Sequence, residues 1–172
     1  MSPARQARDE FAVERRAVPR PANDPYAEVY VGGIETACID RKHMAAMMVD
    51  DCFSARREPG PPKLVFASNG HAIALAGTNE RFRKLFERAD LVHADGEPVV
   101  LASRWLARTA IPERSATTDF IHDAASAARQ DGLKIFLLGA TEDVNRRCAE
   151  ILRFSYPGLR IAGRRNGFFP QG

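Results

Sequence analysis

Ala89-Asp-Leu-Val-His-Ala-Asp-Gly-Glu-Pro-Val-Val100 predicts the end of a helix, a short buried strand, a sharp turn at Asp95-Gly96 and a new helix near Pro98. Proline suits the first helical position because its missing N–H is not needed there. This order places the Asp95 carboxylate at the carboxyl end of a strand and beside a helix N-terminus, where open α/β sheets bind ligands. Asp95 is therefore a candidate catalytic base or hydroxyl-binding group. The alternative is that Asp-Gly is only a turn and Asp95 caps the helix.

Strands and helices alternate on both sides of this stretch. Residues 63–68 are a continuous apolar run, typical of a strand in a sheet that is covered on both faces, and residues 134–138 are the clearest strand of the sequence. Asn69-Gly70 follows the first run, and the helical composition after it places Asn69 at a strand-to-helix turn. The alternation predicts an α/β fold with a Rossmann-like, mostly parallel sheet and helices on both faces.

Local signals set the ends of several elements. Gly32-Gly33 lies between two short β-branched or aromatic segments, which predicts a turn between two strands. Asp40 is a candidate N-cap for a helix with a methionine-rich apolar stripe. Thr78 is a candidate N-cap for the helix that precedes the Asp95 strand.

Length and composition indicate one domain with a leader. The chain has 172 residues; residues 1–27 are rich in arginine and proline and predict a mobile leader, and residues 28–172 predict the domain. The formal net charge of +3, from 25 Lys and Arg against 22 Asp and Glu, does not favour nucleic acid as a partner. Three widely spaced cysteines favour the reducing cytoplasm over a disulfide framework or a zinc site. The sequence has no apolar run long enough to span a membrane, and its first residues lack the apolar core expected of a signal peptide.

The common catalytic motifs are missing from the sequence. It lacks the glycine-rich dinucleotide and nucleoside-triphosphate loops, the nucleophile elbow and the zinc-protease helix, and its four histidines stand singly. We therefore expect no metal site and no cofactor. Polar residues remain at predicted strand ends, and an aspartate with an arginine there would suit removing a hydroxyl proton while a phosphorylated donor is bound. These residues are Asn69, Asp95, Glu113, Arg114 and Asp119.

Five blocks occur in an order that is more specific than any one of them. They are the strand ending in Asn69 and the segments 80–96, 112–120, 134–140 and 156–169. Together they resemble the WecG/TagA/CpsF family of glycosyltransferases over roughly residues 29–169. The resemblance implies transfer of an N-acetylmannosamine-type sugar, with inversion, from a UDP-sugar to a polyprenyl-diphosphate-linked acceptor in surface polysaccharide synthesis. It also implies a cytoplasmic protein that is peripheral to the inner face of the cell membrane.

The resemblance also assigns roles to individual residues. The family's Asp-Gly motif falls on Asp95 and Gly96, which makes Asp95 the expected general base for the acceptor hydroxyl. Asn69 matches the asparagine of the first strand-end motif. Arg114 matches the arginine of the Glu-Arg block, where a guanidinium would hold a phosphate. The polar pair that follows falls on Thr118 and Asp119, and these residues complete the predicted substrate-binding set.

Some positions depart from the family pattern. Ala67 replaces the usual threonine, Pro98 replaces the second glycine of the Asp-Gly-x-Gly motif, and Thr117 replaces a glycine after the Glu-Arg block. The family's further C-terminal blocks are expected after residue 172 and are not in this sequence. These departures leave a second hypothesis open, in which the chain is a non-catalytic, degenerate glycosyltransferase-fold binding or partner protein. An unpaired sheet edge would favour a homo-oligomer.

Overall fold

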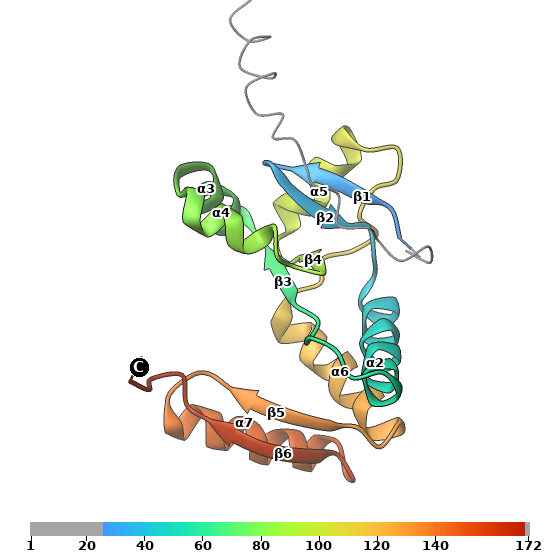
Figure 1. Ribbon diagram of the computed structural model, residues 1–172, viewed down its shortest axis with the longest axis vertical. Coiled ribbons are helices and arrows are strands. Elements are labelled where there is room, and N and C mark those ends of the chain that lie inside the picture. Colours follow the sequence, from blue (N-terminus) through green and yellow to red (C-terminus); the bar gives the residue numbers. More distant parts are fainter. Residues whose placement is uncertain (1–25, 171–172) are drawn as a thin grey trace, which may run out of the picture.

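The computed structural model describes residues 26–170, so the predicted leader over residues 1–27 lies almost entirely outside the described residues. Within the described part, six strands and six helices occur along the chain (Figure 1). Most helices follow a strand, as the sequence predicts. The elements are β1 (Glu28–Val31), β2 (Ile34–Ala37), α2 (Arg41–Arg57), β3 (Val65–Ser68), α3 (Gly70–Thr78), α4 (Glu80–Phe86), β4 (Leu91–Ala94), α5 (Glu97–Leu106), α6 (Thr117–Gln130), β5 (Lys134–Leu138), α7 (Glu142–Ser155) and β6 (Arg160–Arg165).

The α/β class is confirmed, but the strands do not form one continuous sheet. They form three two-stranded sheets: β1 with β2 antiparallel, β3 with β4 parallel, and β5 with β6 parallel. Helix α6 connects the two parallel pairs, because Phe120 near its start packs with Leu91 of β4 and Ala128 near its end packs with Leu133 before β5. In Figure 1 the β5–β6 pair with α7 accordingly lies apart from the β3–β4 pair, with α2 and α6 between.

Helices cover only one face of the β5–β6 pair in the described part of the chain. Ile135 and Leu137 pack in the core with α6 and α7. Phe136 and Leu138 point to the other face and are more than half exposed. The apolar run 134–138 therefore forms the predicted strand, and one face of this strand is open in the described residues.

The predicted turn at Gly32-Gly33 joins β1 to β2 as a hairpin. The two glycines have φ of 59° and 83°, which a two-residue hairpin turn of the favoured hand requires. A Cβ on Gly32 would lie 2.2 Å from the Cγ2 of Ile73, so the turn also packs tightly against α3. The hairpin contributes Val29 and Val31 to a core cluster with Val99 and Val100 of α5.

Asparagines and an aspartate cap three helices. Asp40 accepts a hydrogen bond from the His43 N–H and caps α2, as predicted. The predicted Thr78 cap of α4 is wrong, because Asn79 caps that helix by accepting from the Phe82 N–H at 3.0 Å. The Thr78 hydroxyl instead donates to carbonyls of the last turn of α3, which it helps to close. No helix of the described residues is long and apolar enough to cross a bilayer.

The β3–β4 register brings two predicted site residues together. Ser68 pairs with Ala94, and the Asp95 N–H continues the ladder by donating to the Ser68 carbonyl at 2.8 Å. Because the strands are parallel, the residues that follow them, Asn69 and Asp95, leave the sheet at the same edge. The fold thus places both residues at the carboxyl ends of neighbouring strands.

Candidate active site

Asp95 and Asn69 form the centre of the candidate site. The Nδ2 of Asn69 donates to the Oδ2 of Asp95 at 3.2 Å. The Oδ1 of Asn69 accepts from the Ala72 N–H at 3.0 Å, so the same side chain caps α3. Because the cap fixes the oxygen of the amide, the nitrogen is left to face the carboxylate. Asn69 therefore orients Asp95 through a side chain that is itself held by the helix.

The segment before α6 supplies the second partner of Asp95. The Ser115 N–H donates to the Ala94 carbonyl at 2.7 Å, which fastens this segment to the end of β4. Two residues later, the Thr117 N–H donates to the Oδ1 of Asp95 at 3.2 Å. A carboxylate has about four lone-pair positions, so two hydrogen bonds leave it able to accept a proton from a ligand.

Asp95 does not cap the helix that follows it. The N-cap of α5 is Gly96, which has no side chain to offer, and no side-chain cap bond is present there. The alternative interpretation, in which Asp95 caps α5, is therefore wrong. Its carboxylate instead accepts a hydrogen bond from the Thr117 N–H in the first turn of α6. A Cβ on Gly96 would lie 3.4 Å from the Cβ of Asn69, so glycine lets the two turns approach closely.

Three helix N-termini meet around this carboxylate. Helix α3 begins directly after Asn69, α5 begins after Gly96, and α6 begins at the residue that contacts Asp95. The N-cap positions of α5 and α6 make no side-chain cap bond. Helix N-termini carry partial positive charge and N–H groups without intrahelical partners, so this edge of the fold can attract a phosphate group.

A charged cluster lies beside the start of α6. Arg114 donates to the Oδ2 of Asp119 at 2.9 Å, which joins two residues of the predicted substrate-binding set. Arg41, at the start of α2, lies 3.8 Å from Asp119, 3.4 Å from Asp123 and 3.6 Å from Glu113. The Arg41 N–H also donates to Glu113 at 2.9 Å. Sequence reasoning missed Arg41 because its partners lie more than 70 residues away along the chain.

Of the remaining predicted residues, Thr118 is the least engaged. It lies exposed in the first turn of α6, and none of the hydrogen bonds found in the described residues joins it to Asp95. Its neighbour Thr117 makes that contact through the backbone. A backbone N–H is present at almost every residue, so no side-chain pattern could have distinguished Thr117 from Thr118.

Ala67 of β3 and His93 of β4 are register partners and lie two residues before Asn69 and Asp95. Ala67 therefore leaves no hydroxyl on this face of the sheet. His93 is almost fully buried, and burial lowers the pKa of its ring; the Asp95 carboxylate and the Ser115 backbone oppose that shift with smaller effects. Its Nδ1 has no hydrogen-bond partner in the described structure, nor do the buried hydroxyls of Ser68 and Ser115.

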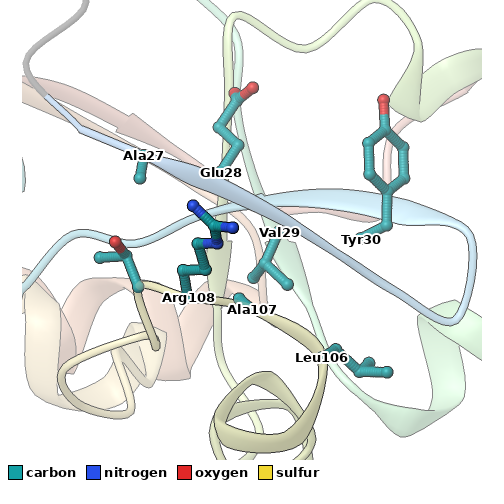
Figure 2. Close-up of a pocket in the computed structure, with 8 residues that line it drawn as sticks. Ala27, Glu28, Val29, Tyr30, Leu106, Ala107 and Arg108 are labelled. Carbon is teal, nitrogen blue, oxygen red and sulfur yellow. The ribbon is translucent and has the colours of Figure 1, made fainter.

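Two cavities in the described part of the chain lie away from Asp95. One, of about 410 Å³, lies between β1 and the segment that follows α5; Figure 2 shows Leu106 and Arg108 beside Val29 of β1. The other, of about 400 Å³, lies between α6 and α7 and is lined mainly by apolar side chains. Within residues 26–170, no group of three or more His, Cys, Asp or Glu side chains has the geometry of a metal site.

Comparisons with known proteins identify the family of this chain. Residues 29–172 match the Glycosyl transferase WecG/TagA/CpsF family. Two proteins named N-acetylglucosaminyldiphosphoundecaprenol N-acetyl-beta-D-mannosaminyltransferase, from Staphylococcus aureus strains MRSA252 and NCTC 8325 / PS 47, are each 28% identical over 98 residues. The matched region covers 57% of this chain and 38% of each relative. Since the family match spans most of the sequence and includes every element that builds the site, the chain belongs to the WecG/TagA/CpsF family of glycosyl transferases.

Proposed function

We propose that this chain is an inverting glycosyltransferase that moves an N-acetylmannosamine-type sugar from a UDP-sugar to a polyprenyl-diphosphate-linked acceptor, for surface polysaccharide synthesis. The family and the printed names of the relatives support the reaction class. The observation that carries the proposal is the Asp95 carboxylate, which Asn69 and the Thr117 N–H orient at the ends of β3 and β4 while two of its lone-pair positions remain open.

In the proposed reaction Asp95 is the general base. The acceptor hydroxyl oxygen attacks the anomeric carbon of the donor sugar, and its proton passes to the Asp95 carboxylate. The bond between the anomeric carbon and the UDP oxygen breaks, and UDP leaves with the electron pair. Attack from the face opposite the leaving group inverts the anomeric carbon. The two hydrogen bonds to Asp95 would keep it in line with the acceptor hydroxyl throughout.

The UDP diphosphate would be held by helix N-termini and arginine. The uncapped starts of α5 and α6 offer backbone N–H groups, and Arg114 is half exposed at the same edge. A guanidinium can bind two phosphate oxygens at once. Arg114 would have to exchange Asp119 for the diphosphate, while Arg41 remains near Asp119 and Asp123.

A second candidate function is ligand binding without turnover. Ala67 favours this candidate, because the resembled family usually has a threonine at this position. Ala67 lies on β3, the strand that Asn69 follows. The matched region also covers only 38% of the relatives' length. The two candidates share a donor site and differ in catalysis.

Calorimetric titration with UDP and UDP-N-acetylmannosamine, with and without a divalent cation, tests the donor site. We expect a dissociation constant near or below ~1 mM, which corresponds to about 4 kcal/mol. Arg114→Gln should weaken binding, while Arg153→Gln, on the exposed surface of α7, serves as a matched control. No detectable UDP binding would refute both candidates. Turnover of a lipid-linked acceptor by the chain would exclude the second candidate, and UDP binding without turnover would favour it.

A further inference from the structure

Helix α5 carries large apolar side chains on two opposite faces. Val99, Val100 and Ser103 point into the core and are almost fully buried. On the opposite face, Leu101 and Trp105 lie four residues apart and are 46% and 90% exposed. A helix that packs one face in a core normally has a polar outer face. The outward face of α5 therefore lacks the composition expected of a surface in contact only with water.

The charge on this face is entirely positive beyond its first turn. Glu97 is the only acid in α5, and between Pro98 and Pro112 the only charged residues are Arg104 and Arg108. Both arginines are exposed, and neither is among the ion pairs found in residues 26–170. Arginines flanking exposed tryptophan and leucine are typical of segments that lie in the interface of a membrane.

The surface continues beyond the end of the helix. Leu106 is 62% exposed, and with Arg108 it lines the cavity of about 410 Å³ that faces Val29 and Tyr30 of β1 (Figure 2). The lining combines apolar Leu106 and Val29 with the Arg108 cation and the Glu28 carboxylate. Leu106 and Arg108 thus continue the apolar and cationic character of the α5 face as far as the edge of this cavity, where Glu28 adds an acid.

We propose that the outward face of α5 (Leu101, Arg104 and Trp105), together with Leu106 at the end of the helix and Arg108 in the segment that follows, docks on an anionic lipid bilayer. Trp105 and the leucines would enter the interfacial region, and the arginines would contact lipid phosphates. The inference rests on the proposed function for its purpose, because the relatives' printed names specify an undecaprenol-linked acceptor. Only Gly96 separates Asp95 from α5, and a rise of about 1.5 Å per residue puts Trp105 about 15 Å from Asp95. The site would therefore sit just above the membrane surface.

Other exposed aromatic side chains have a different charge environment. Phe154 on α7 is as exposed as Trp105, but α7 carries as many acids as arginines, and Arg146 is paired with two of the acids, whereas α5 has no acid after its first turn. Phe136 lies on the open face of β5, and the neighbouring strand β6 carries Arg160, Arg164 and Arg165, so this is the main competing surface. The test must therefore report on α5 itself.

Trp105 is the only tryptophan in the sequence, so its fluorescence reports on this face without labelling. We expect vesicles of phosphatidylcholine with phosphatidylglycerol to shift the emission to shorter wavelength, and brominated lipid to quench it. Pure phosphatidylcholine vesicles should give a much weaker effect, and high salt should weaken the binding. Arg104→Gln with Arg108→Gln should lower vesicle affinity about 25-fold, since each basic residue near an anionic surface contributes about fivefold.

Sedimentation with vesicles extends the test to variants that lack the reporter. Trp105→Ala should lower the affinity about tenfold or more, whereas Phe154→Ala should leave it unchanged. Absence of vesicle binding would overturn the inference, and so would binding without a change in Trp105 emission, which would point to another surface such as that around Phe136. An emission shift that depends on protein concentration without lipid would identify a second copy as the occupant and would also overturn it. UDP titration of the same samples separates this outcome from failure of the proposed function.

Discussion

Replacing Asn69 with aspartate would turn the central hydrogen bond of the site into a pair of facing carboxylates. The Oδ1 of Asn69 caps α3 through the Ala72 N–H, and an aspartate oxygen can make the same bond. The Nδ2, which lies 3.2 Å from the Oδ2 of Asp95, becomes an oxygen. The substitution therefore keeps the helix cap and changes only the contact with Asp95 from attractive to repulsive.

The size of the effect follows from the distance. Two unit charges about 4 Å apart interact by ~4 kcal/mol at an effective dielectric constant of about 20. Asp95 is half-buried, so solvent screening reduces the expected repulsion to roughly 2–4 kcal/mol. The folded variant can relieve it by holding one proton between the two carboxylates. Because the folded state then binds more protons than the unfolded chain, the free energy of unfolding should fall as the pH rises above about 4.

Urea denaturation from pH 4.5 to pH 8 measures this slope. Asn69→Ala is the matched control, because it loses both the cap and the contact with Asp95 without adding charge; it should cost about 1–2 kcal/mol at every pH. Asn69→Asp should be close to the wild-type protein at pH 4.5 and less stable than Asn69→Ala at pH 8. Parallel pH profiles for the two variants would show that Asn69 and Asp95 do not face each other.

Three further substitutions test the base, the buried histidine and the hairpin. Asp95→Asn should lower kcat by about 10²–10⁴-fold while UDP affinity in calorimetry stays within about threefold, and full transferase activity of this variant would remove Asp95 from catalysis. Burial lowers the pKa of His93 in the folded state below 6.5, so the unfolded chain is protonated first and the free energy of unfolding of the wild-type protein should fall as the pH drops through 6.5. Urea denaturation at pH 5 and pH 7.5 should show that His93→Leu lacks this part of the pH dependence. Gly33→Ala should cost about 1–2 kcal/mol from its positive φ alone, and Gly32→Ala should cost more in thermal unfolding because its Cβ also meets Ile73; equal losses would contradict this packing.

Sequence reasoning identified the polar residues at the strand ends because those signals are local. An apolar run followed by Asn69, and another followed by Asp95-Gly96, each mark a strand-to-helix turn without reference to the rest of the chain. Parallel pairing of the two strands then brings the residues together, as found. The hairpin turn at Gly32-Gly33 was predictable for the same reason, since a short glycine turn permits few backbone conformations.

Features that depend on contacts distant in sequence could not be predicted in this way. Hydrophobic pattern indicates that residues 134–138 form a strand, but it does not specify the neighbouring strand, and β5 pairs only with β6 in the described structure. Arg41 joins the charged cluster through acids on and before α6, which only packing of α2 against α6 brings near. Thr117 acts through its backbone, so its side chain carries no signal of the contact.

The pairing of Arg114 with Asp119 is compatible with phosphate binding. Both side chains are more than 40% exposed, and an exposed ion pair of this kind contributes at most about 1 kcal/mol, which a diphosphate with more than one charge can exceed. Asp119 would not be left alone after the exchange, because Arg41 already lies within 4 Å of it. The cluster can therefore release one arginine to a ligand while its acids keep another.

For this reason Arg41→Gln should weaken UDP binding indirectly, because Asp119 would then hold Arg114 more tightly. Calorimetry should show a smaller loss of UDP affinity than Arg114→Gln produces. A loss of UDP affinity equal to that of Arg114→Gln would instead mean that Arg41 contacts the diphosphate directly.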